Sequence, residues 1–404
     1  MEFNKIVRLK DIAEVEMGQS PKSEFYNEQE GTPFLQGTRT FGLLYPIIDT
    51  YTTKVTKWAI EGDILFSVRA PVGDINIATI PLCIGRGLAA VRSKTNNQKF
   101  LFYLLKAFNN YEGHSTGTIF SSINKSTLEN LEFAIPEENI QSSIGDFLWS
   151  IDEKIELNNN IISNLEQLSQ TLFKHWFIDF EFPNEEGKPY KSSGGEMVES
   201  ELGRIPKMFN LSTFGEEITI TRGASPRPIH DYLREEGRPW IKISDVNGLI
   251  GYYLNSTKQF IKEEGIDKSR TIEPGTLILS NSATPGIPVF VNITASVHDG
   301  WLIFKDYKKL SKEFYFLYLK TNRDKILSLS NGSVFRNLKT DILKKYQIVI
   351  PSDELFDKFQ NIVMPLFNMI KNTTDEVNTL QRLRDTLLPK LLSGEIESPD
   401  NLEV

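Results

Sequence analysis

The side chains best suited to nucleophilic catalysis or metal binding are few in this chain and stand far apart. The histidines are His114, His175, His230 and His298, and the single cysteine is Cys83. No two of these residues have the short spacing that zinc ligands show. Cys83 has no histidine near it in the sequence, so a buried thiol is favoured over a nucleophile. The sequence therefore predicts no metal site, and the histidines are interpreted as packed or surface side chains.

Motifs that bind nucleotides or cofactors are also absent from the sequence. There is no GxxxxGK[ST] loop, no GxGxxG turn after a predicted strand, and no Asn-Pro-Pro-aromatic tetrapeptide of the kind found in amino-methyltransferases. We therefore expect this chain neither to hydrolyse ATP nor to transfer a methyl group.

The remaining candidate chemistry depends on an internal repeat. Residues 117–136 (GTIFSSINKSTLENLEFAIP) match residues 332–351 (GSVFRNLKTDILKKYQIVIP) at an offset of 215 without a gap. The same offset aligns LEQLSQTLFK from Leu165 with LQRLRDTLLPK from Leu380. A single offset over such a length predicts a structural duplication, in which each half is a globular module followed by a helix.

Upstream of these segments the two halves still match, with an offset that drifts as loop insertions would cause. The matching pairs are GQSP at Gly18 with GASP at Gly223, TPFLQG at Thr32 with RPWIKIS at Arg238, and EGDILFS at Glu61 with PGTLILS at Pro274. The duplication therefore extends over the globular modules themselves.

One pair of carboxylates offers an alternative catalytic reading. Asp63 and Asp74 flank two predicted strands, where an acidic nuclease site could lie. The corresponding residues of the second half, Thr276 and Ile287, are not acidic. A duplicated nuclease would need both copies, so this reading is disfavoured.

Short β-prone runs bounded by Gly, Pro and Asp dominate each module. They cover residues 64–68, 75–80 and 131–136 in the first half, and LILS, PVFVNIT and YQIVIP in the second. Each module also has one helical run that is apolar nearly all round, beginning at Lys99 and Lys312, which predicts a buried helix. The pattern indicates an α+β protein.

A heptad seam follows each module. Apolar residues recur at steps of four and three at Ile144, Leu148, Ile151, Ile155, Ile162, Leu165 and Leu172, and again, 215 residues later, at Phe359, Val363, Leu366, Ile370, Val377, Leu380 and Leu387. Two such seams predict two long helices that pair as an antiparallel coiled coil. Asn158 and Thr373 interrupt the seams, either to fix the register or at a tolerated wet position. Pro365 should kink the second helix or mark a late start.

These patterns divide the chain into successive segments. They are a first globular domain (1–136), a first helix (137–180), a linker rich in Gly, Ser, Pro and Glu (181–206), a second globular domain (207–351), a second helix (352–396) and a tail (397–404).

Charge is distributed unevenly among these segments. The formal net charge of −8, taken whole, argues against nucleic-acid binding. Residues 1–136 are neutral, with 14 basic and 14 acidic side chains, while residues 204–351 carry 22 and 15, a net +7. The acid is concentrated in residues 137–203, which carry 4 and 14, and in residues 352–404, with 5 and 10. Neutral or basic modules joined to acidic helices suit DNA-facing heads on protein-facing helices.

The sequence also predicts a location. A single cysteine excludes an internal disulfide framework. The first residues, MEFNKIVRLKDIAEVE, are charged throughout and do not resemble a signal peptide, and no run of ~18 apolar residues occurs. We therefore expect a cytoplasmic protein that has no membrane partner.

Four further motifs, in this order, carry a family resemblance. They are GDILFS in the first module, TLFKHWFIDFEFP after the first seam, ELGRIPKMF leading into the second module, and TLLPKLLSGEI from Thr386. With the duplication, they make the chain similar over nearly its whole length to the specificity subunit of Type I restriction-modification systems. One departure is that the first module has no net basic charge.

The resemblance implies two target-recognition domains, each reading one half of a bipartite, asymmetric sequence in double-stranded DNA. It implies that the helices hold two methyltransferase subunits and set the gap between the half-sites, and that the chain itself catalyses nothing. S-adenosylmethionine would be bound by the methyltransferase partners. ATP and magnesium would be bound by a restriction subunit, where one is present.

The candidates for DNA contact are loop residues that both modules share and that can donate to phosphates or base edges. In the first module they are Gln19, Ser20, Lys22, Gln36, Thr38, Arg39, Arg69, Thr118, Ser121, Ser122 and Lys125. In the second they are Arg222, Ser225, Arg227, Lys242, Ser244, Asn281, Ser282, Ser333, Arg336 and Asn337. GxSP is also an ordinary turn, so a purely structural role stays the alternative for each residue.

Two other functions stay open at this point. The chain could be a nuclease or methyltransferase with an unrecognised site, against which the missing motifs argue. It could also be a structural coiled-coil adaptor, although the strand-rich modules are too large to be caps. The large apolar residues Trp149, Phe173, Trp176 and Phe177 either face partners or pack in the core.

Overall fold

The computed structural model describes residues 5–108, 122–328 and 337–397. Contacts divide the chain into two compact units, residues 1–157 with 377–404 (unit 1) and residues 158–376 (unit 2). Each unit holds one strand-rich module and a part of each of two long helices. The candidates Thr118, Ser121, Ser333 and Arg336 lie outside the described residues.

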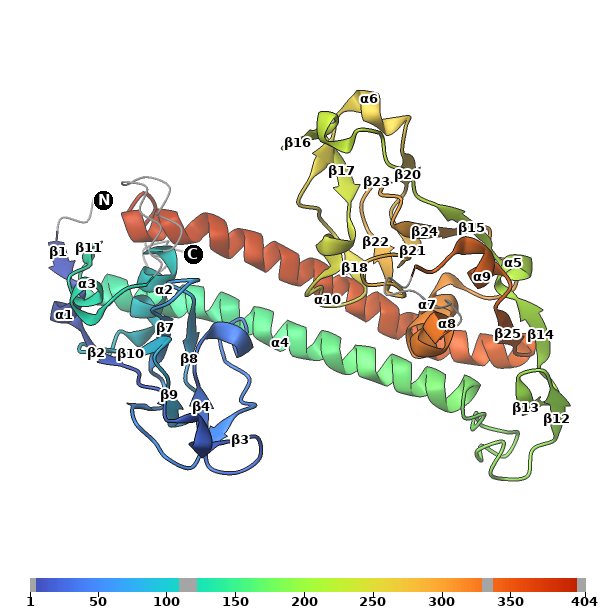
Figure 1. Cartoon of the computed structure of the whole chain (residues 1–404), viewed down its shortest axis with the longest axis horizontal. Helices are drawn as coiled ribbons and strands as arrows, with labels where there is room; N and C mark the ends of the chain where they lie inside the picture. Colours follow the sequence, from blue (N-terminus) through green and yellow to red (C-terminus); the bar gives the residue numbers. More distant parts are fainter. Residues whose placement is uncertain (1–4, 109–121, 329–336, 398–404) are drawn as a thin grey trace. The chain divides into compact units, whose positions relative to one another are not determined.

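The module of unit 1 contains two small sheets (Figure 1). The antiparallel four-stranded sheet has the order β2–β10–β7–β8, with bounds Ala13–Met17, Leu88–Ser93, Ile64–Ser67 and Ile75–Ile77. The five-stranded sheet has the order β3–β5–β4–β9–β6, with bounds Tyr26–Asn27, Tyr51–Thr52, Thr32–Leu35, Leu82–Ile84 and Trp58–Ala59. Strands β1 (Lys5–Arg8) and β11 (Glu132–Ile135) pair separately. The strands predicted in this half are thus all present.

The module of unit 2 has the same kind of sheets. One has the order β15–β24–β21–β22–β18, with bounds Thr219–Arg222, Trp301–Lys305, Thr276–Ser280, Pro288–Val291 and Tyr253–Leu254. The other has the order β16–β19–β17–β23–β20, with bounds Leu233–Arg234, Phe260–Ile261, Arg238–Ile241, Ala295–Val297 and Arg270–Ile272. Strands β14 (Asn210–Thr213) and β25 (Gln347–Ile350) pair separately.

The two modules share one strand arrangement. The strands β2–β10–β7–β8 correspond in order to β15–β24–β21–β22, and β3–β5–β4–β9–β6 to β16–β19–β17–β23–β20. The latter two sheets each contain one parallel pair, β4 with β9 and β17 with β23, among antiparallel pairs. The prediction of two similar globular domains of the α+β class is confirmed.

Short helices complete each module. The predicted buried helices are α2 (Gln98–Phe108) and α7 (Lys312–Thr321), and most residues of both are buried. Ser311 caps α7, since its side chain accepts a hydrogen bond from the backbone of Phe314. The remaining helices are α1 (Leu9–Ile12), α3 (Lys125–Glu129), α5 (Phe214–Glu217), α6 (Glu263–Ile266), α8 (Arg323–Ser328) and α9 (Thr340–Lys344).

Two long helices, α4 (Glu138–Phe177) and α10 (Asp353–Ser393), follow the modules (Figure 1). In unit 1, Leu148 of α4 shares a core with Leu388 of α10. In unit 2, Phe177 near the end of α4 lies 4.7 Å from Phe359 near the start of α10, measured between ring centroids. Early residues of one helix thus meet late residues of the other in both units, which confirms the predicted antiparallel pair.

The buried face of the pair is broader than a two-helix seam. The seam residues Leu165, Leu172, Leu366, Leu380 and Leu387 are only half-buried. Phe367 is fully buried in place of Leu366, because the helices also cover the modules. Trp149, Phe173, Trp176 and Phe177 belong to the core rather than to an outward face. The seam position Asn158 is buried, so it is not a wet position, and its Nδ2 has no hydrogen-bond partner among the described residues.

Two further expectations need correction. Pro365 does not mark a late start, because α10 begins at Asp353. The segment predicted as an exposed linker is partly folded, with a hairpin of β12 (Met197–Ser200) and β13 (Gly203–Pro206). Phe182 is buried against the ring of Phe209, at 5.6 Å between centroids.

The compact units cut both long helices, whereas the sequence analysis divided the chain into consecutive segments. Those segment boundaries therefore stay a prediction. Among the described helices, none is both long enough and apolar enough to cross a lipid bilayer.

Candidate nucleic-acid interface

In the second module, candidate contact residues converge on the loop of residues 298–300, between β23 and β24. Arg222 Nε donates a hydrogen bond to the backbone carbonyl of Asp299 at 2.6 Å. Ser225 Oγ donates to the Asp299 carboxylate at 2.6 Å, and Arg227 lies 3.3 Å from the same carboxylate. Asn281 Nδ2 donates to the Asp299 carbonyl at 3.4 Å. One acidic residue thus joins four predicted contact residues.

The strand order explains this convergence. Arg222 ends β15, Asn281 follows β21, and the 298–300 loop leads into β24, which lies between those two strands in the sheet. Gly223 is needed for the close approach, because a Cβ there would collide with the carbonyl oxygen of His298. Gly223 therefore has a structural role, whereas the nearby Arg222 and Ser225 carry side chains that could contact a ligand.

The other candidates of the second module lie around the same loop. Ser282 Oγ would lie 2.9 Å from a Cβ added at Gly300. Lys242 and Ser244 follow β17, whose last residue, Ile241, accepts a hydrogen bond from the backbone of His298 at 3.3 Å. Asn337 is exposed, next to Leu338, whose backbone N–H donates to the carbonyl of Asn281 at 2.8 Å.

The charges of this loop favour an ionised carboxylate and a neutral imidazole. Burial alone would raise the pKa of Asp299, but the Ser225 hydrogen bond and the charges of Arg222 and Arg227 act against it, and the pKa is lowered. Burial also lowers the pKa of His298; the Asp299 carboxylate acts against this, while the cations Arg227, Arg222 and Lys242 act with it. His298 Nδ1 accepts a hydrogen bond from the backbone of Gly300 at 2.8 Å, as a neutral ring does.

The first module builds the corresponding loop from residues 85–87, between β9 and β10. The backbone N–H of Gly18 donates to the carbonyl of Leu88, and that of Gln19 to the carbonyl of Ile84, both at 2.9 Å. In the second module Gly223 and Ala224 donate to Trp301 and Val297 in the same way. The loop of the first module therefore has the backbone hydrogen bonds of the second.

Ser20 and Gln36 meet this loop directly. Ser20 Oγ accepts a hydrogen bond from the backbone of Arg86 at 3.1 Å, just as Ser225 accepts one from Asp299 at 3.2 Å. The backbone carbonyl of Gln36 accepts from Gly87 at 3.2 Å. The structure thus brings together Gln19, Ser20 and Gln36 around one loop, of which Arg86 is the exposed residue.

The remaining candidates of the first module are distributed more widely. Arg39 and Thr38 lie in the turn η2 (Thr38–Thr40), where Arg39 pairs with Asp49 at 2.8 Å. Lys22 pairs with Glu24 at 3.8 Å, and Lys125 pairs with Glu129 at 3.6 Å. Arg69 and Ser122 are exposed and face each other across an isolated antiparallel bridge.

Three residues of these loops were not predicted from the sequence: Arg86, His298 and Asp299. An alignment of IGRGL (84–88) with VHDGW (297–301) would have shown them, because both segments begin at the last residue of a short strand and keep a glycine at the third loop position. The repeat is weakest here, since one loop has a basic residue at the position where the other has an acidic one.

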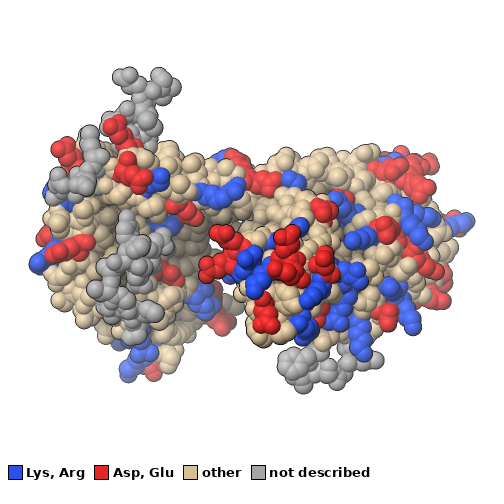
Figure 2. All heavy atoms as spheres, turned by 90° about the horizontal axis from the view of Figure 1, so that it is seen from above, with Lys and Arg blue, Asp and Glu red and all other residues tan. Residues whose placement is uncertain are grey.

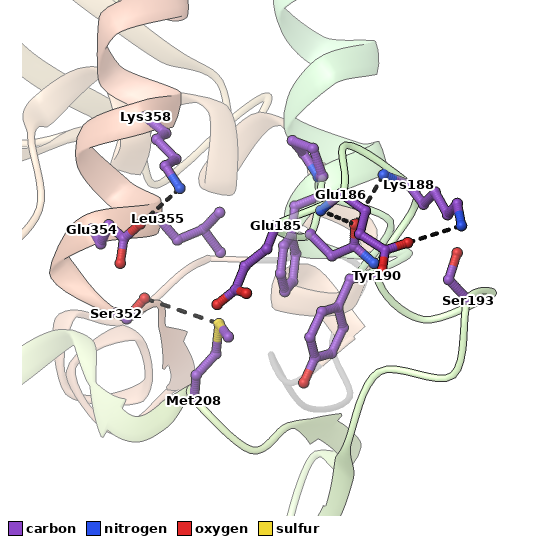
Figure 3. A pocket seen from close by; sticks show the side chains of 13 residues that line it. Glu185, Glu186, Lys188, Tyr190, Ser193, Met208, Ser352, Glu354, Leu355 and Lys358 are labelled. Carbon is purple, nitrogen blue, oxygen red and sulfur yellow. Dashed lines mark hydrogen bonds and ion pairs between the residues drawn. The ribbon is translucent and has the colours of Figure 1, made fainter.

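On the face drawn in Figure 2, basic and acidic side chains are interspersed rather than gathered into one basic surface. A hollow of about 480 Å³ lies beside the segment after α4 and the start of α10 (Figure 3), and no predicted contact residue lines it. Two ion pairs line it, Glu354 with Lys358 at 2.7 Å and Glu186 with Lys188 at 2.8 Å.

One member of the alternative acidic pair, Asp63, is engaged by neighbouring side-chain and backbone donors. The buried carboxylate of Asp63 accepts two hydrogen bonds from Arg92, at 2.7 and 2.8 Å, and one from the backbone of Ile60 at 2.9 Å. The lone pairs of Asp63 are therefore largely engaged in structure. In the part of the chain that the structure describes, no group of three or more His, Cys, Asp or Glu residues is placed to hold a metal ion.

Comparisons with known proteins agree with this arrangement. The family model described as "Type I restriction modification DNA specificity domain" matches residues 1–167 and 206–382. The chain is 28% identical over 417 residues to the Type I restriction enzyme MjaIX specificity subunit of Methanocaldococcus jannaschii, covering 97% of this chain and 93% of that protein. It is 24% identical over 355 residues to the Type I restriction enzyme HindI specificity subunit of Haemophilus influenzae, covering 74% and 77%.

One solved structure is similar over almost the whole chain. It is the S subunit of a Type I restriction-modification system from M. genitalium, with a TM-score of 0.62, 18% identity, and coverage of 96% of this chain and 95% of that chain. At this identity the likeness concerns the fold alone, and it extends over both modules and both long helices.

Proposed function

This chain belongs to the Type I restriction-modification DNA specificity family, and from that premise we propose that it reads a split, asymmetric DNA sequence on behalf of partner methyltransferase subunits. The main support is that the two modules have the same strand order. Their loops 85–87 and 298–300 have equivalent backbone hydrogen bonds but different side chains. Two such modules on one chain could bind two different half-sites at a fixed separation.

In this proposal the candidate residues of each module contact one half-site. Gln19, Ser20 and Gln36 lie next to the 85–87 loop, while Arg222, Ser225 and Arg227 lie against the 298–300 loop. Their amide, hydroxyl and guanidinium groups are the donors and acceptors that contact phosphates and base edges. Reading the half-sites separately would make the target non-palindromic, because the two loops differ.

The long helices would hold two methyltransferase subunits and set the gap between the half-sites. Those subunits would bind S-adenosylmethionine, and a restriction subunit, where present, would bind ATP and magnesium. The chain itself would catalyse nothing, which agrees with the engagement of Asp63 by Arg92. The cytoplasm is the compartment in which such a complex would meet chromosomal DNA.

Single-molecule methylome sequencing tests this proposal. A strain that expresses the chain with its neighbouring methyltransferase gene is compared with a strain that lacks the chain. The expected result is loss of methyl-adenine at one split, asymmetric motif, which also identifies both half-sites. Unchanged methylation in a strain shown to contain active methyltransferase would contradict the proposal and favour a structural adaptor.

A further inference from the structure

We propose that Asp299 is a positioning residue that holds Arg222 and Arg227 for sequence reading by the second module, whereas Arg86, at the same backbone position of the first module, contacts DNA directly. This inference rests on the proposed DNA-reading function and assigns different means of recognition to its two halves. The roles of Asp299 and Arg86 are new here, because neither residue was among the candidates from the sequence.

The first observation is the geometry of the carboxylate. The Asp299 side chain is only 27% exposed, while those of Arg222 and Arg227 are 58% and 79% exposed. Each guanidinium therefore contacts Asp299 and still has most of its side-chain surface exposed, so that further N–H donors stay accessible to a ligand. Donors held in place by a neighbouring group lose less conformational entropy on binding than freely moving ones.

The second observation is that the carboxylate is itself fixed on several sides. Ser225 Oγ donates to Asp299 Oδ1 at 2.6 Å and accepts from the Asp299 backbone at 3.2 Å. His298 Nε2 lies 3.3 Å from the same carboxylate, and its other ring nitrogen is engaged by Gly300. This fixed carboxylate lies 3.3 Å from the guanidinium of Arg227 and 3.8 Å from that of Arg222, whose Nε also donates to the Asp299 carbonyl at 2.6 Å.

The third observation is the charge reversal between the modules. Arg86 occupies the position of Asp299, since Ser20 and Ser225 accept the equivalent backbone hydrogen bond. Arg86 is exposed and has no ion-pair partner among the described residues. It is thus placed to neutralise a phosphate, while a carboxylate at the same place repels one.

These charges predict opposite contributions to binding. An acidic group beside DNA lowers affinity for every sequence, because it offsets part of the attraction to phosphates. Asp299 is compatible with a DNA interface if it restrains its arginines to base edges and limits their indiscriminate phosphate contacts. Removing its charge should therefore raise non-specific affinity and lower discrimination at the second half-site only.

The test uses the complete chain reconstituted with its methyltransferase partner. Binding is measured by fluorescence anisotropy over a series of KCl concentrations. The duplexes carry the intact split motif, a scrambled first half-site, a scrambled second half-site, or neither half-site. The key variant is Asp299→Asn, because the amide oxygen can still accept the Ser225 hydrogen bond while the charge is lost.

For Asp299→Asn we expect tighter binding to the duplex without half-sites and a salt slope steeper by about one to two, as one or two more phosphates are contacted. Discrimination against the scrambled second half-site should fall by about tenfold or more, the scale of one bidentate base contact. Discrimination at the first half-site should not change. The matched variant Arg86→Asp should weaken non-specific binding and make the salt slope shallower.

Other outcomes separate the possible failures. If Asp299→Asn weakens binding to all four duplexes equally, or leaves discrimination intact, the positioning role is wrong. If the wild-type complex discriminates neither half-site, the proposed DNA-reading function itself fails. Should Asp299→Asn not fold, Ser225→Ala keeps the charge but releases the carboxylate, and discrimination at the second half-site should still fall without a gain in non-specific affinity.

Discussion

The two units differ in the side chains that fill the core where α4, α10 and the buried helix of the module meet. These side chains are charged in unit 1 and apolar or neutral in unit 2. In unit 1, the fully buried Asp152 of α4 forms an ion pair with Arg384 of α10. Its carboxylate also accepts from Tyr103 at 2.8 Å and from Lys106 at 3.2 Å. This cluster unites charges from three helices.

In unit 2 the corresponding residues are apolar or neutral. The repeat offset of 215 relates Asp152 to Phe367 and Arg384 to Ser169. Phe367 packs against Phe316 and Tyr252, at 5.9 and 5.2 Å between ring centroids. Ser169 forms a hydrogen bond of 2.9 Å with the hydroxyl of Tyr252.

The difference shows that a duplicated backbone does not dictate the chemistry of its core. A buried ion pair offers little net stability over an apolar replacement, because desolvation offsets the attraction between the charges. Removing only one partner of such a pair is costly, since the charge of the other partner stays buried without compensation. Burial lowers the pKa of Lys106 despite the nearby Asp152 carboxylate, which illustrates this desolvation.

The largest expected effect on stability comes from removing one partner of the charged cluster in unit 1. Arg384→Met should lower the free energy of unfolding by about 3–5 kcal/mol, because Asp152 stays buried with fewer partners. The double variant Asp152→Leu with Arg384→Met should recover most of that loss. Chemical denaturation of the reconstituted complex measures both, and a double variant as unstable as the single one would show that the charges are needed together.

The next effect tests the backbone features that the modules share. Gly18→Ala and Gly223→Ala should each cost about 1–3 kcal/mol, because the added Cβ meets the carbonyl oxygens of Gly85 and His298. Each variant should lose recognition of its own half-site only. Exposed Gly248→Ala is a control without a nearby atom, although its positive φ of 75° adds some backbone strain. Equal loss at both half-sites would contradict independent reading by the modules.

A smaller effect is expected in the apolar counterpart of the cluster. Tyr252→Phe should lower the free energy of unfolding by about 1 kcal/mol, since it removes the hydroxyl that bonds to Ser169 but keeps the packed ring. Thermal unfolding of this variant beside Arg384→Met compares the two units directly. A loss as large as that of Arg384→Met would mean that the polar contact, not the aromatic packing, dominates in unit 2.

The smallest effect on stability should come from the exposed loop of the first module. Arg86→Ala should change the free energy of unfolding by less than about 0.5 kcal/mol, as for most surface substitutions. The salt slope of DNA binding should nevertheless decrease by about one, the contribution of a single phosphate contact. An unchanged slope in salt titrations would place Arg86 outside the DNA interface.

The sequence by itself determined the duplication, the α+β class and the two long helices, because these are expressed in local periodicity and in matched segments such as residues 117–136 and 332–351. It also indicated loops whose described candidate residues the structure partly brings together, among them Arg222, Ser225 and Asn281. Its prediction that these loops contact DNA stays a prediction.

Only the tertiary structure decided which side chains face one another. Arg222 and Asp299 are 77 residues apart and meet because β24 lies beside β15 in the sheet. Asp152 and Arg384 are 232 residues apart and meet because α4 and α10 pack antiparallel in unit 1. Strand order and helix register are collective properties of the packed chain, so the periodicity of one segment cannot determine which distant charge it meets.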